Sequence, residues 1–272
     1  MSDIAARGAV EIDRLVLGIN RQVGSRHGAD LMTEARELGL ESLKLVPHLG
    51  EFWLQRPVPL EFAEARLPYA EPGSIAERID LFESLGLLAR VEGGHIATER
   101  FRALLKSSIR ATERVIVDTW SGLEALVDQA DPLVARVVGA ASAAHVVAAV
   151  HRGLEPPTRS LHRFYWRLVT LRFIRQHDHI AAWQAVGLDS RAIALLTALW
   201  LGNPPPDDGL GRQSLEDKGL ISGTTLTGDG QVLRDAIEAD TNRRAGMAWS
   251  ALAVSEAEQL VALLEALPSS QQ

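Results

Sequence analysis

The amino-acid sequence repeats itself, and this feature limits the possible folds more than any other. Residues 98–123 align without a gap with residues 227–252. The aligned pairs that are identical are Thr98/Thr227, Leu104/Leu233, Thr112/Thr241, Arg114/Arg243, Trp120/Trp249, Ser121/Ser250 and Leu123/Leu252. Two shorter blocks recur upstream in the same order, residues 82–88 with 215–221 and residues 39–42 with 187–190. A repeat of this kind indicates two copies of one structural unit.

Each copy has the predicted element order of a winged helix. A long helix is followed by a turn that contains Gly39 or Gly187 and by a second, apolar helix. A third helix then leads to a short segment of glycines and β-branched residues, and another long helix follows. A hairpin in this position is the wing of a winged helix. The sequence therefore predicts a mainly α fold, a tandem duplication of winged-helix-like units with short β wings.

The boundaries of the units follow from the same blocks. We expect the first winged-helix-like unit at residues 11–124 and the second at residues 153–267. A helix rich in Ala and Val, residues 125–152, would connect them. The tails before residue 11 and after residue 267 are expected to be loose.

The composition excludes several classes of protein. The chain has 272 residues and no cysteine, which excludes disulfides, thiolate catalysis and cysteine-ligated metals. The most apolar stretch, residues 133–150, carries Arg136 and His145, so it predicts a buried helix rather than a membrane span. The N-terminus lacks the basic start and apolar core of a signal peptide. We therefore expect a cytoplasmic protein with no membrane partner.

Two resemblances come from short motifs. Residues 82–88 and 215–221, each followed by a wing and a threonine, resemble the end of the recognition helix in MarR-type winged-helix proteins. Residues 175–183, together with Gly187 and Leu188, resemble a family of actinobacterial helix-turn-helix proteins, and this second resemblance covers most of the chain. It implies the fold rather than an activity, because one fold hosts many activities.

The MarR resemblance implies DNA binding through the third helix of each unit, whereas the charges oppose it. The net charge is −7, and the candidate helices at residues 74–87 and 206–220 each carry more acidic than basic side chains. Phosphate contacts are made mainly by Lys and Arg. We therefore favour winged units that have lost their DNA-reading surface, and keep a DNA-binding regulator, with a homodimer as one form of it, as the alternative.

The predicted helix at residues 159–185 carries the candidate site. At about 100° per residue, one stripe of it holds Leu161, Tyr165, Leu168, Arg172, Arg175, His179 and Trp183. Guanidinium and imidazole groups on a core-facing stripe need an acidic partner, water or a ligand. The corresponding residues of the first copy are Gly24, His27, Leu31 and Ala35, so the polar group is confined to the second copy.

Two interpretations of this stripe remain open. In the first, Arg172, Arg175 and His179 anchor a small anionic metabolite, and Tyr165 and Trp183 stack on its planar part. In the second, the cations form salt bridges between the copies. The acidic partners would then be Asp118, Asp128 or Asp131.

Catalysis and metal binding have weaker support in the sequence. His179 is a candidate general acid or base, and the sequence does not decide whether the protein is an enzyme. His177 and His179 lie about 200° apart on a helix, so they would not converge on one metal ion. His48 is expected to be an ordinary polar residue. The stripe formed by Arg159, Arg163 and Arg167 is expected to be a solvated face, and we expect no cofactor and no metal.

Overall fold

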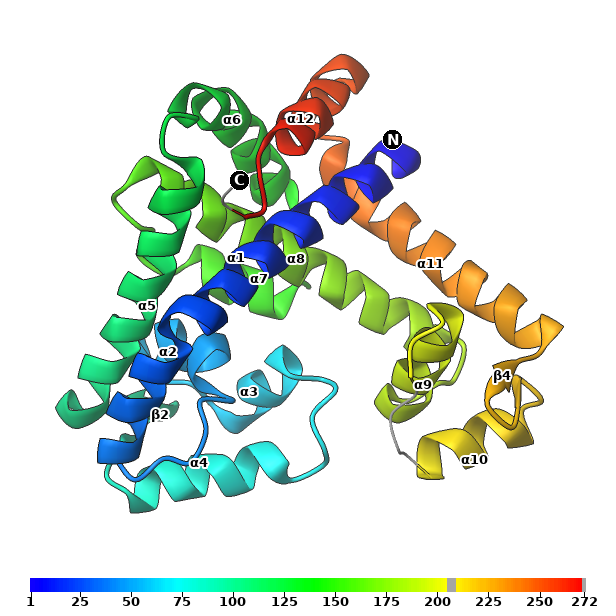
Figure 1. Cartoon of the computed structure of the whole chain (residues 1–272). Helices are drawn as coiled ribbons and strands as arrows, with labels where there is room; N and C mark the ends of the chain where they lie inside the picture. Colours follow the sequence, from blue (N-terminus) through cyan, green and yellow to red (C-terminus); the bar gives the residue numbers. More distant parts are fainter. Residues whose placement is uncertain (205–208, 271–272) are drawn as a thin grey trace.

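The computed structural model describes residues 1–204 and 209–270, and it is mainly helical with short antiparallel hairpins (Figure 1). This confirms the predicted fold class. The first half contains α1 (Ser2–Glu37), α2 (Val46–Gln55), α3 (Leu60–Arg66), α4 (Ser74–Ser84), β1 (Leu88–Val91), β2 (Gly94–Ala97), α5 (Glu99–Trp120) and α6 (Glu124–Ala140). After α7 (Val146–Arg152), the second half contains α8 (Ser160–Ala185), α9 (Ser190–Trp200), α10 (Gly209–Asp217), β3 (Ile221–Ser222), β4 (Thr225–Leu226), α11 (Gly228–Trp249) and α12 (Val254–Ala266). Residues 205–208, which the sequence placed in or beside the third helix of the second copy, lie outside the described residues.

The residues repeated in the sequence have the same local structure in both halves. Helices α5 and α11 each span 22 residues and end at a tryptophan. The hydroxyl of Thr98, before α5, donates to the carbonyl of Gly86 at 2.8 Å, and the hydroxyl of Thr227, before α11, donates to the carbonyl of Gly219 at 2.8 Å. Both glycines have a φ of 67°, which glycine adopts at little cost. The repeated Thr and Gly residues therefore fix the passage from the third helix through the hairpin.

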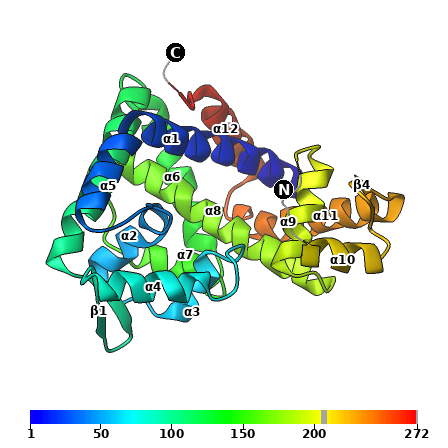
Figure 2. The same cartoon turned by 60° about the horizontal axis from the view of Figure 1, so that its bottom comes forward.

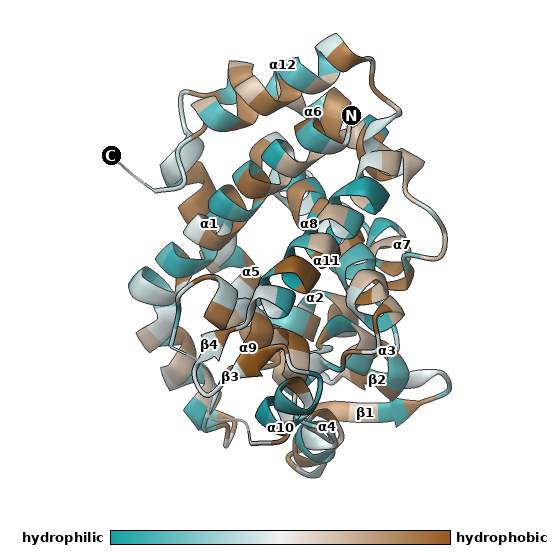
Figure 3. Cartoon of the chain, turned by 90° about the vertical axis from the view of Figure 1, so that its right-hand side faces the viewer, coloured by the Kyte–Doolittle hydropathy of each residue, from teal (hydrophilic) through white to brown (hydrophobic). Residues whose placement is uncertain are grey.

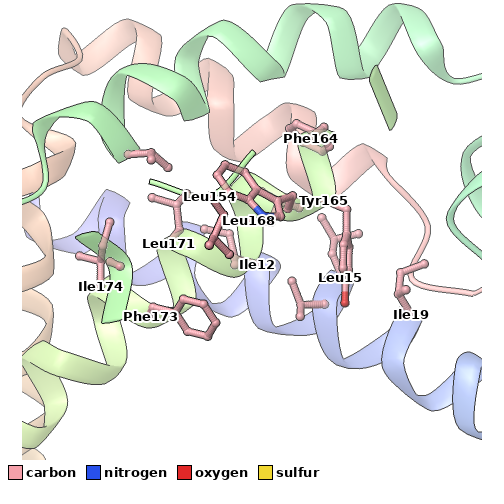
Figure 4. Close-up of a cluster of buried hydrophobic side chains, with 14 of the residues drawn as sticks. Ile12, Leu15, Ile19, Leu154, Phe164, Tyr165, Leu168, Leu171, Phe173 and Ile174 are labelled. Carbon is pink, nitrogen blue, oxygen red and sulfur yellow. The ribbon is translucent and has the colours of Figure 1, made fainter. Parts of the chain in front are cut away.

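The two halves interlock through their first and last helices. Helix α1 packs against α5 of its own half and against α11 and α12 of the other half. Helix α8 likewise packs against α11 of its own half and against α5 and α6 of the other half. Figure 1 shows α1 and α8 crossing the middle of the molecule. The main hydrophobic core is continuous across both halves and includes Leu15 and Ile19 of α1 and Phe164 and Leu168 of α8 (Figure 4).

A second, smaller core fills the winged unit of the second half. It is formed by residues such as Trp183 of α8, Leu196 of α9, Leu215 of α10 and Ile237 of α11. The third helices α4 and α10 lie at the same end of the molecule, below the central helices in Figure 1, and Figure 2 turns that end forward. The third helices of both halves thus lie toward one end of the molecule.

The structure corrects the expectation that the tails are loose for residues 1–10 and 268–270, whereas residues 271 and 272 lie outside the described residues. Helix α1 begins at Ser2, and Gly8 lies so close to the Trp249 ring that an added Cβ would be 2.2 Å from it. Near the other end, the Trp120 indole donates to the carbonyl of Pro268 at 2.9 Å. The sequence pattern missed both contacts because they join residues that are far apart in the chain.

The connecting segment is also different from the single helix that was expected at residues 125–152. It forms α6 and α7, which are separated by a turn at residues 141–145. The hydroxyl of Ser142 accepts a hydrogen bond from the backbone N–H of Ala144 at 3.1 Å, and such local bonds compete with helical ones. None of the described helices is long and apolar enough to cross a membrane, and Figure 3 shows polar and apolar residues alternating along the outer helices.

Candidate functional site

A cavity of about 1140 Å³ lies between the central helices. Its wall comes from α1, α2, α5, α8 and α11, from α3 and the segment that follows it, and from single residues of α6 and α7. This volume suits a small organic molecule. The charged and hydrogen-bonding side chains that line it include Asp13, Asn20, His48, Glu51, Arg66, Tyr165, Arg172, Arg175 and His179. The fold therefore forms a partly open pocket where the helices of the two halves meet.

Arg66, the last residue of α3, is the least compensated cation of this wall. Within residues 1–204 and 209–270 it forms no ion pair with a carboxylate, and its buried Nε has no hydrogen-bond partner. Its Nη2 lies 3.4 Å from Nδ1 of His48, and its guanidinium carbon lies 4.4 Å from the centre of the Phe173 ring. Burial, together with the charge of Arg172, lowers the pKa of Arg66 to about 10. A positive charge is thus held in the wall without a neutralising partner.

The guanidinium groups of Arg66 and Arg172 make one end of the cavity cationic, and His48 lies beside them. Nε of Arg172 donates to Oδ1 of Asp13 at 2.6 Å. Burial, and then the charges of Arg66 and Arg172, lower the pKa of His48 to about 4. His48 is therefore neutral at pH 7, and its Nδ1 accepts the Arg66 hydrogen bond, which leaves the proton on Nε2. An anion beside these groups would relieve the repulsion between the two guanidinium groups.

Arg175 and His179 line the same cavity but are held by α11. Arg175 donates to Glu238 and, at 3.2 Å, to Oδ1 of Asn242. Nδ1 of His179 lies 3.1 Å from the hydroxyl of Thr241. Burial, followed by the charges of Arg234 and Arg175, lowers the pKa of His179 to about 4. These two residues therefore combine a cavity position with a structural link between α8 and α11.

The two aromatic residues of the predicted site lie in different surroundings. Tyr165 lines the cavity and donates its hydroxyl proton to Oδ1 of Asn20 at 2.9 Å, and burial raises the pKa of this hydroxyl. Trp183 is not among the lining residues and is buried in the second core. The cavity thus brings together Tyr165, Arg172, Arg175 and His179, with Trp183 behind them.

The acidic partners differ from those considered in the salt-bridge interpretation. Asp131 pairs with Arg167, and Asp118 pairs with Arg26 at 2.6 Å. Arg172 and Arg175 pair instead with Asp13 and Glu238, residues that no motif in the sequence singled out.

The basic stripe at the start of α8 is also engaged within the molecule. Arg159 pairs with Glu113 at 3.0 Å, and Arg163 donates to the carbonyl of Thr158 at 3.2 Å. The ring centre of His177 lies 4.8 Å from that of His145, whereas His179 contacts the hydroxyl of Thr241. The two histidines of α8 therefore have different neighbours. Across the described part of the chain, no three potential ligand side chains gather in a way that could hold a metal ion.

The cations on and beside α4 and α10 are also engaged. Arg78 of α4 donates to the hydroxyl of Ser42 at 2.8 Å, and Arg212 of α10 donates to the carbonyl of Gly223 in the hairpin. Arg90 of the first wing pairs with Glu83 at 3.1 Å. Each of these guanidinium groups is engaged within its own half of the molecule. Fewer cationic groups are therefore left to contact DNA phosphates.

Comparison with known families places the chain. The model of a helix-turn-helix family matches residues 88–270, which is 183 of the 272 residues. The chain belongs to this helix-turn-helix family. The match begins at β1 of the first winged unit and covers the whole second half. The comparisons with curated proteins and with solved structures give no match.

The sequence alone did not identify Arg66, His48 and Asp13 as site residues. A weak signal existed for α1, because Asp13 and Asn20 are seven residues apart and interrupt an otherwise apolar helix face. No comparable signal existed for Arg66, which lies on a short helix between two loops. Its position against α8 depends on long-range packing.

Proposed function

We propose that this helix-turn-helix protein binds a small, anionic and partly aromatic metabolite in its central cavity. The observation that carries the proposal is Arg66, which has no acidic partner among the described residues and lines the same cavity as Arg172. A buried charge without a partner is costly, whereas a bound carboxylate or phosphate would accept charge-assisted hydrogen bonds from both guanidinium groups. The Nε2–H of the neutral His48 would supply a further donor.

The remaining lining suits the planar part of such a ligand. Phe173 lies beneath Arg66, and Tyr165 and Trp166 add aromatic surface along α8. Aromatic side chains in a cavity stack on planar rings at an offset or edge to face. In this proposal, Arg175 and His179 form the polar wall next to α11, and Trp183 supports α8 from behind.

The alternative function is that of a DNA-binding regulator with the same cavity as its effector site. The family match favours it, and so does the position of α4 and α10 at one end of the molecule (Figure 2). The engaged arginines and the acidic surroundings of these helices weigh against it.

We also infer that the chain arose by tandem duplication of a MarR-like winged-helix unit and that it acts in the cytoplasm.

The test compares an anion with its neutral analogue. Benzoate, phenyl phosphate and benzamide are titrated against the purified chain while thermal unfolding is followed. A ligand at a hundred times its Kd stabilises the folded state by about 2.7 kcal/mol. We expect benzoate or phenyl phosphate to raise the Tm and benzamide to leave it unchanged.

Two variants locate the binding. Arg66→Met should reduce the shift to about half or less, whereas Arg163→Met, which changes an arginine of α8 outside the lining, should retain it. Equal shifts with benzamide, or an unchanged shift in Arg66→Met, would show that the cavity does not recognise anions through Arg66.

A further inference from the structure

The cavity has a second polar group, the carboxyl of Glu51 on α2. Its side chain keeps 29% of its surface exposed and lines the cavity. Oε1 accepts a hydrogen bond from the Trp166 indole at 2.8 Å, and Oε2 lies 3.4 Å from Nε2 of His151. The His151 ring is buried and stacks on Trp166 with centroids 4.3 Å apart. Glu51 is therefore oriented by two buried aromatic groups.

The hydrogen bonds around His151 hold its ring in place. The hydroxyl of Thr170 lies 3.0 Å from the carbonyl of Trp166 and 2.8 Å from Nδ1 of His151. The contact of Nδ1 with Thr170 turns the other ring nitrogen, Nε2, toward Oε2 of Glu51.

The contacts of Glu51 determine what it presents to the cavity. A carboxylate has about four lone-pair positions; the Trp166 indole occupies one of them, and Nε2 of His151 lies beside Oε2. A carboxylate accepts hydrogen bonds and cannot donate them. A ligand group that contacts Glu51 must therefore donate a hydrogen bond.

The spacing of this acceptor from the cationic end follows from helix geometry. His48 and Glu51 are three residues apart on α2, and such neighbours have Cβ atoms about 5–6 Å apart. Trp166, which orients Glu51, and Phe173, which lies beneath Arg66, are seven residues apart on α8. At about 1.5 Å per residue this is roughly 10 Å along the helix axis. A single small molecule can span both groups.

We propose that the ligand carries a hydrogen-bond donor, a hydroxyl or an N–H, that binds Glu51 while its anionic group binds Arg66 and Arg172. This inference rests on the proposed function and narrows the ligand class to aromatic acids with a hydroxyl or amino group far from the acid. Glu51 is a specificity residue of the site, and His151 and Trp166 are positioning residues.

Three matched ligands test the proposal on the wild-type protein. They are 3-(4-hydroxyphenyl)propanoate, 3-phenylpropanoate and 3-(4-methoxyphenyl)propanoate, and their affinities are compared by isothermal titration calorimetry. A hydrogen bond to a charged group predicts that the hydroxyl compound binds roughly tenfold more tightly or better. The methoxy compound has only an acceptor and should gain nothing. Equal affinities would overturn this inference alone, whereas no binding of any of the three would overturn the proposed function with it.

Two variants assign the preference to Glu51. Glu51→Leu should reduce the advantage of the hydroxyl compound to less than about twofold while 3-phenylpropanoate still binds. Glu113→Gln changes another carboxyl of the lining, one that pairs with Arg159, and should retain the advantage. A preference that survives Glu51→Leu would overturn the assignment. The ligand comparison on the wild-type chain decides the proposal even if the E51L chain does not fold.

Discussion

Replacing Arg66 by Met separates a binding role from a structural one, because the two roles predict opposite changes in stability. Burial and the charge of Arg172 lower the pKa of Arg66 to about 10. At about 1.4 kcal/mol per pKa unit, holding the charge costs the folded state about 3 kcal/mol. Solvent screening of this partly exposed group reduces the cost, and the contact with Phe173 returns about 1 kcal/mol. We therefore expect Arg66→Met to raise the free energy of unfolding by about 1 kcal/mol.

The same substitution should weaken ligand binding. Loss of a charge-assisted hydrogen bond costs about 1.5–3 kcal/mol, or roughly a 10- to 100-fold increase in Kd for benzoate. Urea unfolding measures the first effect, as a higher midpoint with an unchanged slope, and calorimetry measures the second. Arg66→Lys keeps the charge but loses the planar fork. Its free energy of unfolding and its Kd for benzoate should therefore lie between those of the wild type and those of Arg66→Met. A decrease in the free energy of unfolding by more than about 1 kcal/mol, or unchanged benzoate binding, would refute the reasoning.

Other consequences can be measured independently. Arg175→Met leaves Glu238 without its α8 partner and should lower the free energy of unfolding by about 3 kcal/mol in urea titrations; no loss would mean that this ion pair does not hold α8 to α11. Burial and nearby arginines lower the pKa of His48 and of His179 to about 4, against about 6.5 for an unfolded histidine. Between pH 4 and pH 6.5 the folded state thus binds fewer protons than the unfolded state, so the contribution of these histidines to stability should be complete above pH 6.5 and decrease toward pH 4. The Tm should depend less on pH in His48→Gln and in His179→Gln; profiles parallel to that of the wild type would exclude these histidines as the cause. In gel-shift assays at about 100 mM salt, the chain should show no tight, sequence-dependent binding to its own upstream DNA, and such binding would favour the regulator instead.

The sequence predicted those parts of the fold that depend on local contacts and that recur in both halves. The aligned Thr98 and Thr227 mark the starts of α5 and α11, because each donates to a glycine carbonyl of its own unit. The aligned Trp120 and Trp249 mark the ends of the same two helices. The helical stripe correctly placed Arg172 on a face that meets the rest of the core. Periodicity could do this since it depends only on neighbouring turns of one helix.

The cavity could not be predicted in the same way. Its wall combines residues from both halves, and Arg172 meets Asp13 across 159 positions of the chain. Trp183 shares a helix face with the cavity residues, yet α9 and α10 cover it in the second core. The tails were misjudged for the same reason, because Gly8 and Pro268 are ordered by tryptophans far away in the chain. Contacts of this length leave no periodic signal in the sequence.

Locating a bound anion tests the central claim most directly. Crystals of the chain grown with 4-bromobenzoate would reveal the bromine by anomalous scattering and the carboxylate by its density. The account predicts one molecule in the central cavity, its carboxylate within hydrogen-bond distance of Arg66 and Arg172 and its ring along the aromatic side chains of α8. An empty cavity at saturating ligand, or a carboxylate bound away from both guanidinium groups, would contradict it.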